Sequence, residues 1–575
     1  MASESSQLLN TLTVIKLKTI LRDAKLPVSG LKSVLISRVL ENIEHPSIRT
    51  FFDTYSPTST PTPTPILTNN NDKNDQNSSI DPSPINKTSN EDRLEAMNKI
   101  LEDVSVAHKH VIRILIDNKS DSISLRGILD PIENGDLKLF YKAFLLNTSV
   151  RKLFISNQYI SMYMMKTIKK ILLSNRLTDL TINSSPMDHH VGYMVPLNEG
   201  IKHTTSLINL KLAMLLDDEN LSILKDSIIS NTSIKSLDLK SNRIKCENID
   251  TICDILKHNH TLQVLNLSDN DMSSPRSFVT NTNPNLLLDA FRANNTLKEL
   301  KLSGNRLNFF SLRSLLRGIE ESNINALDIS YNDMITETWG YLNNVCANNN
   351  NIQRLILAGN KVATQEFLVL CNTIITHKNI LELNIQHCIF DFVPSNIIAR
   401  LITANFIEKL DISYLRLINN RDQLLFREPV YVAVRFGDDM RLIIDALEGN
   451  TTLRELYIRG MITTTYISSF LKVVRDIPML SVLDISSNEI GKYGYLVADI
   501  LMDNKLNELR ILYTRLSDES ISAIIDGVES TTNLILLIAD PVGGKFDKSM
   551  ERVYINRENY KHRYRNLLGI LMDEF

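Results

Sequence analysis

The sequence predicts an α/β solenoid in which short parallel strands lie inside and helices lie outside. The first observation is a recurring phrase, which reads SIKSLDLKSNRI, then TLQVLNLSDNDM, then TLKELKLSGNRL. The second is its spacing, because the central leucines follow one another after 28, 35, 27 and 28 residues at Leu237, Leu265, Leu300, Leu327 and Leu355. Self-similarity at such a period is the signature of a repeat architecture.

Each copy of the phrase predicts one strand followed by one helix. Around the central leucine, apolar and polar residues alternate, which is the period of a half-buried strand. After the strand, apolar residues recur at helical spacing and form one helix face, as at Ile249, Ile252, Cys253 and Leu256. A single strand–helix unit cannot cover its own core, so neighbouring units must stack.

An asparagine lies five residues after each central leucine. We expect its amide to be buried and to bond backbone groups of its own and the next repeat, because buried polar groups need hydrogen-bond partners. These residues form a predicted structural ladder of Asn242, Asn270, Asn305, Asn332 and Asn360.

The form L-x-x-L-x-L-x-x-N-x-Φ resembles the leucine-rich repeat. The period of 27–28 residues, with N-x-T/S before each phrase, is similar to the ribonuclease-inhibitor type. The resemblance implies a horseshoe, and asparagine or cysteine at the turn is typical of the family, as at Asn488 and Cys388. Leu415 and Met461 depart from that pattern, so we expect a different local loop there.

The array is expected to span residues 119–550 with about 14–15 repeats. One degenerate repeat is predicted at Leu125. The other anchor leucines outside the central five are Leu153, Leu180, Leu210, Leu383, Leu410, Leu456, Leu483, Leu509 and Leu537.

Two intervals exceed the repeat period. The interval from Leu265 to Leu300 has about seven extra residues, and the interval from Leu410 to Leu456 has about eighteen. Insertions leave the stack as loops, and loops often carry function. The second insertion, near residues 417–440, is interpreted either as a contact loop or as a solvated excursion, and it contains Arg421, Arg427, Tyr431, Arg435 and Phe436.

The residue between the two strand leucines of each repeat is expected to face the concave surface. Aspartates alternate there with bases and apolar residues, so no charge sign dominates and a protein partner is favoured over a nucleic acid. The expected partner-binding residues are Lys211, Asp238, Asn266, Lys301, Asp328, Asn384, Asp411, Tyr457, Asp484 and Arg510.

Residues 1–50 predict a small all-α module. Two amphipathic segments flank LPVSG at 26–30, which ends the first helix and offers Ser29 as the cap of the second. The pattern resembles the SAP motif, with the usual leucine after the arginine replaced by Val39. The matching residues are Leu17, Lys18, Leu21, Leu26, Gly30, Lys32, Leu35, Ile36, Arg38 and Leu40.

The SAP resemblance implies a DNA-binding unit with modest sequence preference. From Leu8 to Glu44 there are six bases and three acids, which suits phosphate contacts that weaken with salt. A mini-bundle with solvated bases, or a module that binds RNA or only protein, is the alternative. The expected DNA-binding residues are Lys16, Lys18, Arg22, Lys25, Ser29, Gly30, Lys32 and Arg38.

A tether and two caps are predicted around the array. Residues 51–90 are rich in Pro, Asn and Ser and have too little apolar surface to offset ordering entropy, which predicts a disordered linker. Residues 91–118 carry a long amphipathic pattern and are expected to be an N-terminal capping helix, because solenoid ends expose core. Residues 551–575 are basic and aromatic and are interpreted as a C-terminal capping helix rather than a nucleic-acid contact.

Net charge, cysteine spacing and the motifs that we do not find limit the classes of function that the sequence allows. The chain has 575 residues and a formal net charge of -3, so any nucleic-acid binding must be local. Five cysteines without C-x-x-C spacing predict reduced thiols and an intracellular protein. We find no signal-peptide plan, no membrane-spanning run and no catalytic motif, and we expect neither a metal nor a cofactor.

The sequence therefore favours a non-enzymatic, nuclear adaptor that binds DNA or chromatin through the SAP-like module and a protein through the repeats. One alternative is a GTPase-activating protein resembling the Ran activator, which uses this repeat type, although the long acidic tail common in that family is missing. Another is a cytoskeletal or ubiquitin-pathway scaffold.

Overall fold

The chain divides into two compact units, Met1–Ser83 and Pro84–Phe575. The computed structural model describes residues 90–539 except 105, 107–108, 127–133, 187–193, 217, 273–285, 333, 420–429 and 434. Of the first unit it describes Leu21, Ile36, Val39 and Leu40, which are helical, and the first three are buried. The predicted C-terminal capping helix lies outside the described residues, and so does the predicted linker apart from Asn90, which begins a helix.

The second unit is built on one parallel sheet of fifteen strands in strict chain order. Because every strand pairs with the strand of the next repeat, the sheet grows along the array. The strands are β1 (Ser122–Arg126), β2 (Lys152–Ile160), β3 (Asp179–Pro186), β4 (Asn209–Ala213), β5 (Ser236–Asp238), β6 (Val264–Asn266), β7 (Glu299–Lys301), β8 (Ala326–Asp328), β9 (Arg354–Ile356), β11 (Glu382–Asn384), β13 (Lys409–Asp411), β16 (Glu455–Tyr457), β17 (Val482–Asp484), β18 (Glu508–Ile511) and β19 (Leu536–Ala539).

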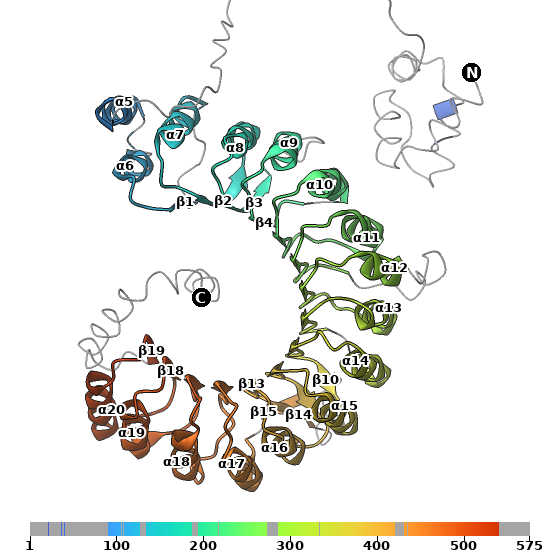
Figure 1. Ribbon diagram of the computed structural model, residues 1–575, viewed down its shortest axis with the longest axis vertical. Helices are drawn as coiled ribbons and strands as arrows, with labels where there is room; N and C mark the ends of the chain where they lie inside the picture. Colours follow the sequence, from blue (N-terminus) through green and yellow to red (C-terminus); the bar gives the residue numbers. More distant parts are fainter. Residues whose placement is uncertain are drawn as a thin grey trace, which may run out of the picture. The chain divides into compact units, whose positions relative to one another are not determined.

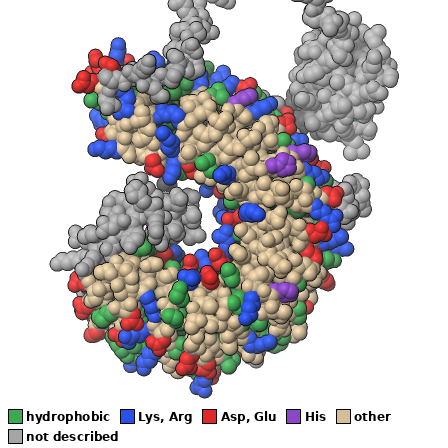
Figure 2. Space-filling model, in the orientation of Figure 1, with side chains coloured by type: hydrophobic (Ala, Val, Ile, Leu, Met, Phe, Trp, Pro, Cys, Tyr) green, Lys and Arg blue, Asp and Glu red, His purple; other side chains and the backbone are tan. Residues whose placement is uncertain are grey.

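Helices cover the outer side of this sheet, and the strands line the inner side of the arc (Figure 1). Charged side chains of both signs are interspersed along the edges of the arc (Figure 2). The helices are α5 (Asn90–Asp103), α6 (Lys109–Asp117), α7 (Asn134–Leu146), α8 (Met162–Leu173), α9 (Val195–His203), α10 (Asp218–Ser230), α11 (Ile249–His258), α12 (Leu286–Ala293), α13 (Phe309–Glu320), α14 (Thr336–Asn348), α15 (Thr364–His377), α16 (Ser395–Thr403), α17 (Met440–Leu447), α18 (Ile467–Asp476), α19 (Gly494–Met502) and α20 (Asp518–Ser530).

The predicted α/β leucine-rich-repeat solenoid is confirmed, and so is its register. Every anchor leucine from Leu153 to Leu537 lies opposite the anchor of the neighbouring strand. The first repeat differs, because Ile123 pairs with Leu153 and the predicted anchor Leu125 pairs with Ile155. Both Ile123 and Leu125 point inward and are buried, so alternation alone could not distinguish them.

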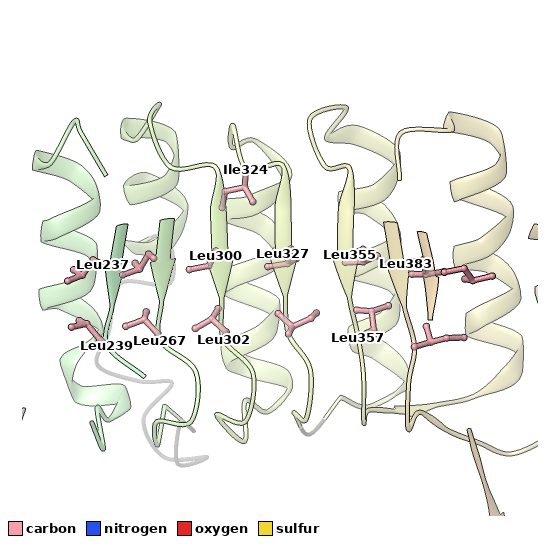
Figure 3. Close-up of a cluster of buried hydrophobic side chains, with 14 of the residues drawn as sticks. Leu237, Leu239, Leu267, Leu300, Leu302, Ile324, Leu327, Leu355, Leu357 and Leu383 are labelled. Atoms are coloured by element: carbon pink, nitrogen blue, oxygen red, sulfur yellow. The ribbon is translucent and has the colours of Figure 1, made fainter. Parts of the chain in front are cut away.

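The core consists of leucine rows that run along the array between the sheet and the helices. Figure 3 shows two such rows, one containing Leu300, Leu327 and Leu355 and the other containing Leu302 and Leu357. These five side chains are at most 3% exposed. Burial of each leucine contributes about 1.5–3 kcal/mol, and each row is completed only by neighbouring repeats.

The predicted asparagine ladder is present. Asn270 donates from Nδ2 to the carbonyl of Leu239 in the preceding repeat at 3.0 Å and to Leu267 of its own repeat at 2.8 Å. Its Oδ1 accepts the backbone N–H of Ile244 at 2.9 Å. Cys388 substitutes for asparagine by donating Sγ–H to the carbonyl of Leu357 at 3.2 Å. Where the asparagine is absent, the sulfur of Met461 accepts the N–H of Leu415.

A second asparagine ladder explains the N-x-S/T triplets. Asn231 donates from Nδ2 to the carbonyl of Ile201 at 2.8 Å, while its Oδ1 accepts the N–H of Ile234 at 2.8 Å. Asn259 makes the equivalent bond to Ile228 at 2.7 Å. Both amides are 2% exposed, so they fasten the end of one helix to the turn before the next strand and are inaccessible to glycosylation in the folded protein.

The predicted single helix over 91–118 is two helices, α5 and α6. The first helix ends at Asp103; Val104, the next residue, is buried, whereas Val106 is 85% exposed. Valine and serine have low helix propensity, which favours an interruption of the helix at these residues. The amphipathic pattern continues on both sides of the interruption, so the sequence alone suggested one helix.

The insertion near 417–440 forms a hairpin. β14 (Arg416–Asn419) pairs antiparallel with β15 (Val430–Ala433) and joins β10 (Lys361–Val362) and β12 (Ile389–Phe390) in a second sheet. Phe436, predicted as a contact residue of an exposed loop, is instead 3% exposed and belongs to the core. Arg421 and Arg427 lie outside the described residues.

Candidate partner-binding face

The strands align the predicted partner-binding residues in one row on the inner sheet face. Lys211 pairs with Asp238, Asp238 with Asn266, and Asn266 with Lys301. The row continues through Asp328, Asn384, Asp411, Tyr457, Asp484 and Arg510. The repeat geometry therefore brings the ten predicted residues onto one face.

Two residues of this row are poor candidates for direct contact. Asp411 and Asp484 are 5% and 1% exposed, and both lie against Arg459 with N–O distances of 3.6 Å. Burial raises the pKa of Asp411, and the Arg459 guanidinium opposes that shift. The expectation that these carboxylates face a partner is wrong, because a buried carboxylate needs its own counter-charge.

Arg459 is held rigidly between these carboxylates. Its Nη2 donates to Oε1 of Gln386 at 2.7 Å, and its Nε donates to Oγ of Ser413 at 3.3 Å. The guanidinium also lies 5.6 Å from the ring centroid of Tyr414. Arg459 thus serves to neutralise the aspartates and to support the tyrosine ring.

Other charges on the face are also paired within it. Lys211 lies 3.9 Å from Asp238, and Glu299 binds Lys301 at 3.1 Å and Arg354 at 2.9 Å. Lysine and arginine are interspersed with acids along the inner edge (Figure 2). A face with self-paired charges attracts polyanions weakly, since counterion release requires free cationic groups.

Tyr457 and Arg510, both predicted to face the concave surface, lie close to each other. The Tyr457 hydroxyl donates to Oε2 of Glu455 at 2.9 Å, and its ring centroid lies 5.5 Å from Nζ of Lys409 and 6.0 Å from Cζ of Arg510. Burial, followed by the Glu455 charge, raises the pKa of Tyr457, so the phenol stays protonated and its ring is flanked by two cations.

A row of left-handed residues borders the face and was missed at the sequence level. Each lies four residues after its anchor leucine, just before the ladder asparagine position. The sequence did carry a signal for this conformation, because glycine, which adopts positive φ freely, occurs at this position in three repeats. The row is Met214, Ser241, Asp269, Gly304, Tyr331, Gly359, His387, Tyr414, Gly460, Ser487 and Tyr513, all with φ between 50° and 70°.

The cysteines are unpaired thiols, and four of the five are buried. Burial raises the pKa of Cys253, Cys346 and Cys388 to about 12. These thiols are therefore protonated at neutral pH and packed as small apolar groups.

The described residues contain neither a cluster of metal ligands nor a membrane-spanning helix. No group of three or more His, Cys, Asp or Glu residues in the described ranges could hold a metal ion. None of the helices in those ranges is long and apolar enough to cross a membrane. The predicted DNA-binding residues, Lys16 to Arg38, all lie outside the described residues.

Comparison with known families agrees with both sequence resemblances. The SAP domain model matches residues 8–44, and a leucine-rich-repeat model matches residues 230–246, 258–275 and 293–308. The chain contains a SAP domain and leucine-rich repeats. The SAP domain suggests DNA binding and the repeats suggest protein binding, and both are typically non-enzymatic modules.

Among solved structures, the chain is similar to an internalin, InlF, from Listeria monocytogenes. The two share 13% sequence identity over 78% of this chain and 98% of that one, with a TM-score of 0.31. No curated protein matches the sequence.

Proposed function

We propose that this protein is a non-enzymatic nuclear adaptor that binds DNA through its SAP domain and a protein through the inner face of its repeats. The observation that carries the proposal is the combination itself: a SAP domain at residues 8–44 precedes a fifteen-stranded repeat array in the same chain. A chain that carries both modules can bring its protein partner to DNA without any catalytic step.

The DNA-binding half of this proposal, called the DNA arm below, is supported by the charge of the SAP domain. Within residues 8–44 six bases face three acids, whereas the whole chain has a net charge of -3. Lys32 and Arg38 lie in the second predicted helix, which follows Gly30 and would present a free N-terminus to phosphate.

DNA binding by the full chain across a salt series tests this arm. We expect the logarithm of the DNA-binding constant to fall linearly with the logarithm of the salt concentration. We also expect the affinity to drop at least tenfold in Lys32→Glu/Arg38→Glu. The matched control is Arg441→Glu/Lys472→Glu, which makes the same charge change at exposed positions on α17 and α18. Equal DNA affinity of the two double variants would contradict DNA binding by the SAP domain.

The protein arm rests on the inner face, where polar and aromatic side chains are supported by a rigid sheet. We propose to place a photo-crosslinking amino acid at Ile356, in the centre of the row, and in a control protein at Val369, which is 45% exposed on outer helix α15. A specific protein adduct is expected at position 356 only. The same adducts at both positions, or at neither, would exclude the inner face as the binding surface.

A further inference from the structure

We propose that an aromatic ridge at the edge of the inner face, formed by Tyr331, His387 and Tyr414, binds an acidic, extended segment of the partner protein together with Arg416. This inference rests on the proposed protein arm and specifies the chemistry of its partner. The ridge spans β8 to β13, near the middle of the array (Figure 1).

Two of the ridge's rings lie over glycines of the next repeat, and two of them stack on each other. A Cβ built at Gly359 would collide with Cδ1 of the Tyr331 ring, so the ring lies across the next repeat. The rings of His387 and Tyr414 stack, with centroids 5.1 Å apart and planes 6° from parallel. Tyr414 in turn lies over Gly460, where a Cβ would be 2.9 Å from Cε1.

The backbone favours other residues at these positions. Tyr331, His387 and Tyr414 have φ of 51°, 56° and 50°, a region that costs bulky side chains energy and that glycine adopts freely. The Tyr331 side chain is nevertheless 51% exposed, so its packing offsets only part of that cost. His387 and Tyr414 are half-buried beside it. A strained, exposed aromatic residue such as Tyr331 is a reason to look for binding.

Two arginines, Arg416 and Arg459, act on the side chains of the ridge. Burial, followed by the charges of Arg416 and Arg459, lowers the pKa of His387, and a backbone hydrogen bond with Tyr414 opposes this shift. Arg459 is neutralised by Asp411 and Asp484. Arg416 is exposed and has no ion-pair partner among the described residues, so its guanidinium is available to a carboxylate of the partner.

A basic row extends this surface. Arg243 and Arg306 lie six residues after their anchors, as Arg416 does, and both are exposed without an ion pair in the described ranges. Arg243 follows β5 and Arg416 follows β13, six strand steps apart, or about 29 Å at the usual spacing. An extended segment of about nine residues has this length.

A protein segment fits better than a nucleic acid. The free arginines of the basic row are separated by two and four strand steps, about 10 and 19 Å, which is sparse for a strand with a phosphate on every nucleotide. Tyrosine and arginine are the side chains most enriched in protein hot spots.

The test measures binding of a labelled glutamate–tyrosine copolymer to the full chain carrying Lys32→Glu/Arg38→Glu, which removes the SAP contribution. We expect Tyr331→Gly and Arg416→Glu each to weaken binding about tenfold. Arg441→Glu, the same charge change on α17, should stay within about twofold. The melting temperature of Tyr331→Gly should be unchanged or higher, since glycine suits φ of 51°.

Four outcomes would overturn the inference. The first is a lysine–tyrosine copolymer that binds as well as the acidic one. The second is unchanged binding in the two ridge variants. The third is oligothymidylate that binds as tightly and is released by Tyr331→Gly, which would make the ridge a nucleic-acid surface. The fourth is a photo-adduct at position 356 that persists in Tyr331→Gly, which would exclude the ridge alone. If no adduct forms at position 356 even with Tyr331 intact, protein binding by the inner face is excluded as well.

Discussion

At the residue scale, the ladder asparagines decide whether the turns can be buried. Asn360 donates to the carbonyls of Ile329 and Leu357 at 3.0 and 2.8 Å, and its Oδ1 accepts the N–H of Asn332 at 3.0 Å. The side chain is fully buried. No water replaces it easily, so its removal leaves three backbone groups with poorer partners.

We therefore predict that Asn360→Ala lowers the free energy of unfolding by about 2–3 kcal/mol, because buried backbone groups lose their bonds. Urea unfolding followed by circular dichroism would measure this. Asn344→Ala is the control, since Asn344 is exposed on α14 and alanine is the better helix former there. Equal destabilisation by both substitutions would contradict a structural ladder.

A second prediction concerns the glycine beneath Tyr331. Gly359→Ala should cost about 1 kcal/mol for its φ of 70° and about 1–3 kcal/mol more for displacing the ring. Gly449→Ala has a similar φ of 74° and open space around its Cβ, so it isolates the backbone cost. Matching losses of stability in urea would show that the Tyr331 ring moves away freely.

At the element scale, the strand–helix repeat could be read from the sequence, but its ends and exceptions could not. Leucine spacing fixed the register from Leu153 to Leu537 because a strand period of two admits one alignment per repeat. It misplaced the anchor in β1, where Ile123 and Leu125 are both inward. The hairpin of β14 and β15 was also missed, since its pairing depends on β12 of a neighbouring repeat.

The caps lead to a prediction about local stability. Leu115 of α6 is fully buried, and its change to alanine should loosen mainly the first repeats, because solenoid repeats contact only their neighbours. Trp339 in α14, the chain's one tryptophan, reports the central repeats. We expect Leu115→Ala to lower the circular-dichroism midpoint while the Trp339 fluorescence midpoint changes little.

Leu342→Ala is the matched control for this measurement. Leu342 is equally buried but lies one turn from Trp339 in α14, so its loss should shift the fluorescence midpoint directly. If Leu115→Ala shifts both midpoints equally, the array unfolds as one cooperative unit.

At the scale of the whole molecule, the sequence identified both modules, but it could not rank the residues of the inner face. Asp411 and Asp484 have the same alternating position as Asp238, yet they are buried because Arg459 arrives from the intervening strand. Glycines at three positions of the left-handed row signalled its backbone conformation, but nothing in the sequence signalled that tyrosine and histidine adopt the same φ in other repeats. Contacts between neighbouring repeats therefore decide which side chains of a solenoid are accessible to a partner.

Two modules in one chain should recruit a partner to DNA only when both are intact. We predict that the wild-type protein retains a labelled glutamate–tyrosine copolymer on immobilised DNA, because binding of one module holds the other at high local concentration. Lys32→Glu/Arg38→Glu should abolish retention by losing the DNA, and Tyr331→Gly should abolish it by losing the copolymer. Since the two changes act in separate compact units, Tyr331→Gly should leave DNA affinity unchanged. Retention that survives Lys32→Glu/Arg38→Glu would show that DNA is bound outside the SAP domain, and retention that survives Tyr331→Gly would show that the copolymer is bound outside the ridge. Either result would contradict the adaptor mechanism as proposed.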